Sequence, residues 1–285
     1  MLFDFGRIRY QAVGICAALG ALMLAGSVKA ADSVDVEHGK YLVTIGICAG
    51  CHTPLGPDFK HIEAMRLAGG GRAGPLNTPN LTPDVETGLG SWTDDQVVSA
   101  IRNGKRPDGS SIRPPMGVFF YRDLSDHDAK SIVAYLKSLP PIKNKVARSP
   151  VTIPAPSFTP VESVAEPNAE DRGKYLAITV GHCMQCHTPR GANGLPDLSR
   201  VGMGGNTLPV PGGGTVVTPN LTPGNPDGIV QWTDEQVKKI ITHGERPDGS
   251  TLLPNMDFEM YAEMTPEDLT ALVKYLRSLK PIASN

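Results

Sequence analysis

Apolar residues recur at helical spacing in two stretches that lie 140 residues apart. Each stretch places four apolar side chains on one helix face: Ile132, Val133, Leu136 and Leu139 in the first, and Leu272, Val273, Leu276 and Leu279 in the second. These helices are predicted to begin at Ser125 and Thr265, and Pro266 suits the first helical position of the second. No segment shows sustained two-residue alternation, so the pattern predicts an all-α fold.

Two further helix starts are marked by the sequences "TDDQ" from Thr93 and "TDEQ" from Thr233. In such a capping box the threonine hydroxyl accepts from the third helical amide, while the glutamine side chain reaches back to the threonine amide. The sequence therefore predicts a helix after each of these threonines.

These matched features belong to an internal repeat. Residues 78–142 align without a gap with residues 218–282, and 30 of these 65 positions are identical. Further upstream, "GKYL" from Gly39 recurs from Gly173. The chain therefore contains a duplicated domain, predicted at residues 34–142 and 169–282. Residues 143–168 between the copies are rich in proline and read as an extended, semi-rigid connector.

The first thirty residues have the pattern of an export signal. Arg7 and Arg9 precede an apolar stretch, and Val28 and Ala30 occupy the small-residue positions of a cleavage site. We expect residues 1–30 to be a signal peptide that is cut after Ala30, which would place the protein in the periplasm. An uncleaved anchor is the alternative, because the uncharged run is close to the shortest length that spans a bilayer. Membrane association therefore stays open.

Charge excludes one class of partner. Removal of residues 1–30 would take three of the 27 basic and one of the 29 acidic side chains, leaving 24 against 28. A chain with this balance has no basic stripe that could neutralise phosphates, so nucleic acid is not expected to bind.

The candidate chemistry lies in two C-x-x-C-H motifs, "CAGCH" at 48–52 and "CMQCH" at 183–187. Two thiols with this spacing can add to the two vinyl groups of one haem, and the next histidine can then hold the iron. We therefore predict two covalently attached haem c groups, with these residues binding them: Cys48, Cys51, His52, Cys183, Cys186 and His187.

Other uses of the motif fit less well. A four-cysteine zinc site would not need the histidines, and its two cysteine pairs would come from different repeats. A thioredoxin-like dithiol requires alternating strands and helices, and a disulfide within each pair would leave the histidines unexplained.

The second axial ligands are predicted from the alignment of the repeats. The gapless alignment pairs Met116 with Met256, whereas Met65 and Met203 lie in loops of unequal length. Met260 and Met264 align with Phe120 and Leu124, a pattern typical of packing residues. A methionine opposite histidine raises the potential of a haem.

At these motifs the chain resembles class I cytochromes c. The segments "CAGCHTP", "TPNLTPDVETGLGSWTDDQ", "RNGKRPDGS" and "LSDHDAKSIVAYLKSLPP" are similar to those of dihaem and trihaem cytochrome subunits of periplasmic dehydrogenases for alcohols, aldehydes or gluconate. The resemblance implies two tandem domains that each enclose a haem in helices, with His52 and Met116 on one iron and His187 and Met256 on the other. A third C-x-x-C-H motif, usual in the trihaem subunits, is missing here.

The expected function is electron transfer from a periplasmic dehydrogenase to another cytochrome or a terminal oxidase. The alternative is a dihaem redox enzyme of the peroxidase or thiosulfate dehydrogenase type. Haem catalysis generally needs an open iron position, yet each repeat offers a methionine to close it. A sensor is the third class, and it would need an output domain.

The remaining polar candidates are ambiguous in sequence. Arg106 and Arg246 could pair with haem propionates or lie on solvated turns. Trp92 and Trp232 are predicted as core aromatics, and Asn80 and Asn220 as turn residues. The other histidines have no counterpart in the other repeat and are expected at the surface: His38, His61, His127, His182 and His243.

Overall fold

The structure is a computed structural model. It describes residues 35–73, 76–149, 159–192, 194–210, 213–253 and 256–283. The predicted signal peptide, 1–30, lies outside the described residues, as does the middle of the predicted linker. No helix within the described ranges is long and apolar enough to cross a membrane.

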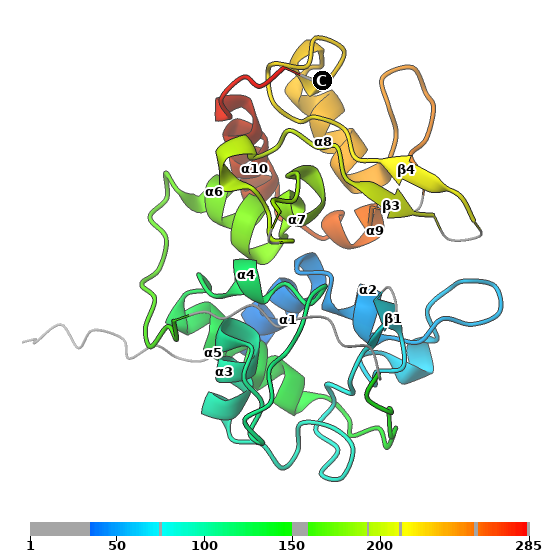
Figure 1. Ribbon diagram of the computed structural model, residues 1–285, viewed down its shortest axis with the longest axis vertical. Helices are drawn as coiled ribbons and strands as arrows, with labels where there is room; N and C mark the ends of the chain where they lie inside the picture. Colours follow the sequence, from blue (N-terminus) through cyan, green and yellow to red (C-terminus); the bar gives the residue numbers. More distant parts are fainter. Residues whose placement is uncertain are drawn as a thin grey trace, which may run out of the picture. The chain divides into compact units, whose positions relative to one another are not determined.

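The first repeat is built around helices α1, α3 and α5, which lie together in Figure 1. Its elements, in chain order, are α1 (Val36–Ile45), α2 (Cys48–His52), the 3-10 turn η1 (Glu63–Met65), β1 (Arg72–Ala73), β2 (Leu76–Asn77), α3 (Asp94–Asn103), α4 (Val118–Tyr121) and α5 (Asp126–Ser138).

The second repeat has the same order apart from two added segments, η2 and η4, and α6, α8 and α10 take the corresponding places in Figure 1. Its elements are α6 (Arg172–Tyr175), the π-helical segment η2 (Leu176–Val180), α7 (Cys183–His187), the 3-10 turn η3 (Leu198–Arg200), β3 (Thr207–Pro209), β4 (Thr215–Val217), the 3-10 turn η4 (Ile229–Gln231), α8 (Asp234–His243), α9 (Phe258–Tyr261) and α10 (Pro266–Ser278).

The predicted helix starts are confirmed. Both capping boxes are complete, because Thr93 and Thr233 each accept from the N3 amide and receive a bond from the N3 glutamine. Ser125 and Thr265 cap α5 and α10, and Pro266 opens α10. The apolar faces of α5 and α10 are buried in the core, with only Leu139 partly exposed among the eight predicted residues.

Two short hairpins correct the prediction of an all-α fold. Strand β1 pairs antiparallel with β2, and β3 pairs antiparallel with β4. Each strand has only two or three residues, which is too short for an alternating pattern to be visible in the sequence.

Glycine allows the close crossing of the first and last helices of each repeat. A Cβ atom on Gly39 would lie 1.9 Å from the carbonyl oxygen of Ser131 in α5, and one on Gly173 would lie 2.0 Å from that of Ala271 in α10. These two glycines open the repeated "GKYL" segments, so the repeat preserves this close contact.

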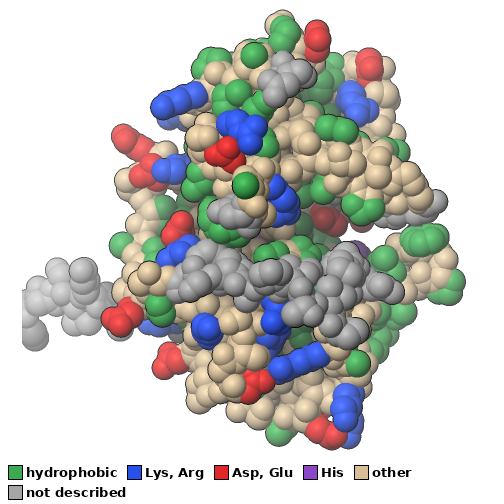
Figure 2. Space-filling model, viewed as in Figure 1, with side chains coloured by type: hydrophobic (Ala, Val, Ile, Leu, Met, Phe, Trp, Pro, Cys, Tyr) green, Lys and Arg blue, Asp and Glu red, His purple; other side chains and the backbone are tan. Residues whose placement is uncertain are grey.

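The described part of the predicted linker packs against the first repeat. The Val161 amide donates to Asn103 Oδ1 at 2.8 Å, and Ser163 Oγ donates to Asp126 Oδ2 at 2.6 Å. The start of the linker is anchored as well, because Asn144 Nδ2 donates to the Ala68 carbonyl at 2.9 Å. On the face shown in Figure 2, basic and acidic side chains of the described residues are interspersed.

Candidate functional site

Both C-x-x-C-H motifs form short helices that begin at a strained residue. Ile47 (φ 48°) precedes α2 and His182 (φ 34°) precedes α7, so each motif is preceded by a left-handed residue that is not glycine. Such residues cost free energy and persist where the surroundings hold them, which is common at functional sites. In each repeat a buried tyrosine helps: Tyr121 donates to the Gly46 carbonyl at 3.1 Å, and Tyr261 donates to the Gly181 carbonyl at 3.0 Å.

The two motif histidines have the same orienting contact. His52 Nδ1 lies 2.8 Å from the carbonyl oxygen of Pro79, and His187 Nδ1 lies 3.0 Å from that of Pro219. A carbonyl oxygen only accepts, so each Nδ1 carries the proton and each Nε2 keeps a free lone pair. Burial lowers the pKa of both imidazoles, which favours the neutral form that a metal requires.

The surroundings of the motif thiols favour their neutral form. Cys48, Cys51, Cys183 and Cys186 are all free cysteines. Burial raises the pKa of Cys48 and of Cys183 to about 12, whereas a reactive dithiol needs a lowered value. The raised pKa values therefore do not fit a redox dithiol.

A cavity of about 1160 Å³ joins these groups. Its lining includes all four thiols, both motif histidines, and Met116 and Met256. Met65 and Met203 are not among the lining residues, whereas Met264 is buried in the core and Met260 packs against it. The volume exceeds the usual range for a small-molecule pocket, about 300 to 1,000 Å³.

The cavity wall contains further residues that the repeats share. Trp92, Trp232, Arg106 and Arg246 line it, as do residues of β2, β3 and β4. Arg106 Nη1 also donates to the Ser111 carbonyl at 3.0 Å, and Arg246 Nη1 makes the same bond to Thr251. Both arginines therefore order a turn and face the cavity, so the two roles considered for them are compatible. The hairpins that the sequence analysis missed form part of the wall.

The two predicted turn asparagines have that role. Asn80 Oδ1 accepts from the Thr82 amide at 2.9 Å, and Asn220 Oδ1 accepts from the Thr222 amide at 2.8 Å. Their amide nitrogens donate to the carbonyls of Ile142 and Ile282, which ties the turns to the end of each repeat.

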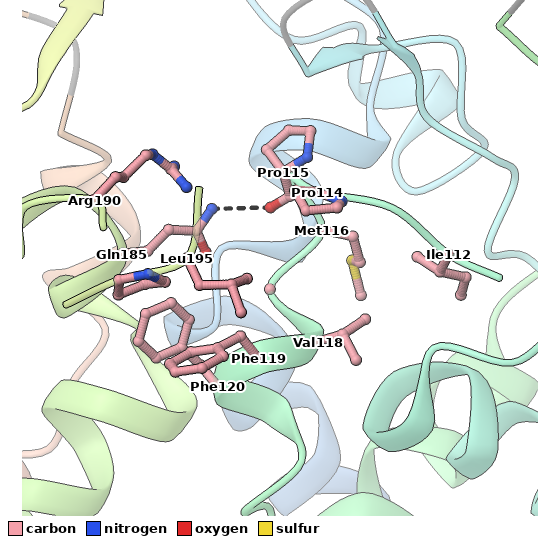
Figure 3. A pocket seen from close by; sticks show the side chains of 12 residues that line it. Ile112, Pro114, Pro115, Met116, Val118, Phe119, Phe120, Gln185, Arg190 and Leu195 are labelled. Carbon is pink, nitrogen blue, oxygen red and sulfur yellow. Dashed lines mark hydrogen bonds between the residues drawn. The ribbon is translucent and has the colours of Figure 1, made fainter. Parts of the chain in front are cut away.

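Each motif also meets the methionine loop of the other repeat, a relation that sequence reasoning missed. Gln185 Nε2, within the second motif, donates to the Pro115 carbonyl at 2.9 Å, next to Met116 (Figure 3). Met116 points away from Gln185, toward Ile112 and Val118. The reciprocal position in the first motif is Gly50, where a Cβ would lie 3.2 Å from Asp257 Oδ1, beside Met256. The alignment of the repeats does not predict these contacts, because the two motifs have different residues, Gly50 and Gln185, at the equivalent position.

The donor set of each repeat fits a covalently attached haem. Two thiols on one helical turn, an imidazole with a free Nε2 and a thioether all face the same space, and the first three come from five consecutive residues. The four thiols do not form a zinc cluster: within the described part of the chain, the one group of potential metal ligands within 4.8 Å of one another is His38, His127 and Asp128.

Comparison with known proteins agrees with this donor set. The cytochrome c family profile matches the chain twice, at residues 36–140 and 170–280. The chain is 30% identical to a dihaem c-type cytochrome of Cereibacter sphaeroides, over 87% of both proteins. It is 27% identical to the cytochrome c subunit of the quinone alcohol dehydrogenase of Gluconobacter oxydans, over 94% of this chain. It is 29% identical to the cytochrome c subunit of the gluconate 2-dehydrogenase of Pantoea cypripedii, over 87% of this chain. It spans 60% of the length of each of these two dehydrogenase subunits.

Proposed function

The chain belongs to the cytochrome c family and carries two covalently attached haem c groups, and we propose that it receives electrons from a periplasmic dehydrogenase and passes them to another cytochrome or a terminal oxidase. Electron transfer as such follows from the relatives, which are cytochrome subunits of dehydrogenases. What we propose beyond electron transfer is the dehydrogenase as donor, the cytochrome or terminal oxidase as acceptor, and the periplasmic location. The predicted export signal supports the location, and haem c is attached outside the cytoplasm.

We assign one set of residues in each repeat to hold a haem. In the first repeat, Cys48 and Cys51 would hold the haem covalently, and His52 and Met116 would hold its iron. The equivalent residues of the second repeat are Cys183, Cys186, His187 and Met256. When bound, the haem supplies an iron that accepts and releases one electron at a time.

The residues around each site keep the histidine and methionine that would hold the iron in a constant arrangement. The Pro79 and Pro219 carbonyls fix the orientation of the two histidines, because each accepts the Nδ1 proton. The first methionine loop is fixed by the bond from Gln185 to the Pro115 carbonyl. A constant ligand set keeps structural change between the two oxidation states small. The thioether also favours the ferrous state, which suits an acceptor of electrons from a dehydrogenase.

The two haem sites open into one cavity, which supports a relay within the chain. Cys51 and Cys186 both line this cavity, and the second motif contacts the methionine loop of the first repeat. The shared cavity and this contact support electron exchange between the two sites within the chain.

One observation carries the proposal: a methionine and an oriented histidine of each repeat line the same cavity. Carbon monoxide should therefore bind the reduced protein slowly or incompletely at neutral pH, and hydrogen peroxide should not be turned over. Rapid, complete binding at either haem together with peroxide turnover would support the dihaem enzyme instead. The donor is identified by purifying the native protein from periplasmic and membrane fractions. The proposed donor would be contradicted if the native protein is purified without any dehydrogenase and if no dehydrogenase reduces it.

A further inference from the structure

A cluster of two histidines and a carboxylate lies where the two repeats meet, away from the haem motifs. His38 Nε2 in α1 lies 2.6 Å from Asp128 Oδ1 in α5, and His127 Nδ1 lies 3.6 Å from the same oxygen. The two imidazole ring centroids are 5.2 Å apart. These histidines were expected at the surface, yet both are only partly exposed, at 26% and 30%.

The second repeat provides a natural comparison for this cluster. By the alignment of the repeats, Asp268 corresponds to Asp128, Arg172 to His38, and Glu267 to His127. Arg172 binds Asp268 through two bonds, Nε to Oδ1 at 2.8 Å and Nη2 to Oδ2 at 2.6 Å. In the second repeat, Asp268 is therefore paired with a side chain that is always positively charged.

The first repeat has no permanent cation in that position. Asp128 is only 1% exposed, and its Oδ2 accepts from the Tyr175 hydroxyl at 2.7 Å. Its Oδ1 faces His38, whose charge depends on protonation. A buried carboxylate is costly unless it is paired, and His38 pairs with Asp128 as a cation only while the imidazole is protonated. A metal ion bound between Asp128 and the two imidazoles would supply a permanent charge, as Arg172 does in the second repeat.

We propose that His38, His127 and Asp128 bind a divalent transition metal ion of the zinc class. Two imidazole nitrogens and one carboxylate oxygen are ligands that zinc, copper and nickel accept. Tetrahedral zinc would place neighbouring ligand atoms about 3.3 Å apart, and the two distances to Asp128 Oδ1, 2.6 and 3.6 Å, lie on either side of this value. All three ligand atoms lie within 4.8 Å of one another.

The surroundings of the cluster fit an open site. Glu166 Oε1, from the described end of the predicted linker, lies 4.0 Å from His127 Nδ1 and is half exposed, so it or a water molecule can complete the coordination. Arg172 interacts electrostatically with His38 and Asp128, but its two hydrogen bonds go to Asp268. The bond from Tyr175 to Asp128 is the type of outer contact that holds a ligating carboxylate in place.

A metal ion here would connect three segments. It would bridge α1 and α5 directly, and through the bond between Asp128 and Tyr175 it would strengthen contact with α6 of the second repeat. An ion that binds only the folded protein stabilises it, by about 2.7 kcal/mol at a hundred times the dissociation constant.

The test uses the mature dihaem protein after treatment with a chelator. Zinc chloride is titrated at neutral pH by calorimetry, and the melting temperature is measured with and without zinc. We expect one zinc ion to bind and to raise the melting temperature. His127→Ala should weaken binding at least tenfold while it leaves the bonds of Asp128 to His38 and Tyr175 in place. His38→Arg, which copies the second repeat, should abolish the zinc effect while it keeps the melting temperature of the metal-free protein.

The control is His243→Ala, because His243 is an exposed histidine of α8 outside the cluster. This variant should bind zinc like the wild type. The proposal is overturned if the wild type shows no stoichiometric zinc binding, if His127→Ala binds zinc as tightly as the wild type, or if His243→Ala removes the same site.

Discussion

The hydroxyl of Tyr41 donates a 2.7 Å hydrogen bond to Oδ2 of Asp268, a residue 227 positions later in the chain. The equivalent residues make the same bond in the opposite direction, because the Tyr175 hydroxyl donates to Asp128 Oδ2, also at 2.7 Å. The two repeats therefore exchange matching tyrosine–carboxylate bonds. Such reciprocity is typical of a two-fold interface between identical surfaces, and here it is preserved within one chain.

The two bonds should differ in their contribution to stability. Each tyrosine also accepts from a backbone amide, Tyr41 from Thr265 at 3.4 Å and Tyr175 from Ser125 at 3.1 Å. Tyr41→Phe leaves Asp268 with both bonds from Arg172, whereas Tyr175→Phe leaves the more deeply buried Asp128 with His38. We expect about 1 kcal/mol of destabilisation for Tyr41→Phe and about 2 to 3 kcal/mol for Tyr175→Phe. Denaturant unfolding at neutral pH measures both. A larger loss for Tyr41→Phe would contradict the role given to Arg172.

Acid should weaken this interface through Asp268. Burial alone would raise the pKa of Asp268, but the bonds from Arg172 and Tyr41 outweigh burial and hold that pKa below its usual range. A lowered folded-state pKa gives stability that is present above the unfolded pKa, about 4, and is lost as the pH falls through the folded value.

Asp268→Asn should therefore destabilise the protein at neutral pH and reduce the steepness of acid unfolding below about pH 4. Stability is measured by denaturant unfolding at a series of pH values from neutral downward. Asp227→Asn serves as the control, because Asp227 is an exposed carboxylate of the same repeat. An unchanged acid profile in Asp268→Asn would show that the carboxylate is not the titrating group.

The axial methionines can be counted by spectroscopy. Met116→Ala and Met256→Ala should each remove about half of the absorption from methionine-to-ferric-iron charge transfer, because each removes one of two thioethers. Absorption spectra of the oxidised protein measure this change. Met65→Ala and Met203→Ala are the matched controls, since neither residue lines the cavity. If either control loses the absorption instead, the assignment of Met116 and Met256 fails.

A loop after each haem motif allows a reciprocal test of backbone strain. Phe59 and Gly194 occupy equivalent positions, since the amide of each bonds back to Gly56 or Gly191, at 3.0 and 2.9 Å. Both are left-handed, with φ of 61° and 74°, but Phe59 has a Cβ and an exposed ring. The left-handed conformation costs such a residue about 1 to 2 kcal/mol.

Phe59→Gly should therefore stabilise the protein by about 0.5 to 1 kcal/mol, because part of the relief is offset by the greater freedom of glycine in the unfolded chain. Gly194→Phe should destabilise it by about 1 kcal/mol. Both changes are measured by denaturant unfolding. Destabilisation by Phe59→Gly would mean that the exposed ring makes a contribution that outweighs its strain.

The sequence by itself determined the local features of this protein. Helix starts at Thr93, Ser125, Thr233 and Thr265 follow from side chains that satisfy amides within three residues, so no distant contact is needed to recognise them. The haem motifs are equally local, because five consecutive residues supply both thiols and the histidine. The gapless repeat also paired Met116 with Met256. The domain boundaries and the signal peptide stay predictions.

Only the tertiary structure decided which distant residues meet. The bond from Tyr41 to Asp268, the bond from Gln185 to the Pro115 carbonyl, and the cluster of His38 with Asp128 join residues 227, 70 and 90 positions apart. A single sequence carries no periodicity at such separations, and at two of these places the repeats differ, with Arg172 for His38 and Gly50 for Gln185. The first two contacts arise because two copies of one fold pack against each other in one chain. His38 and Asp128 meet because α1 packs on α5 within the first repeat. Both kinds of packing depend on the summed surfaces of the packed elements rather than on any local pattern.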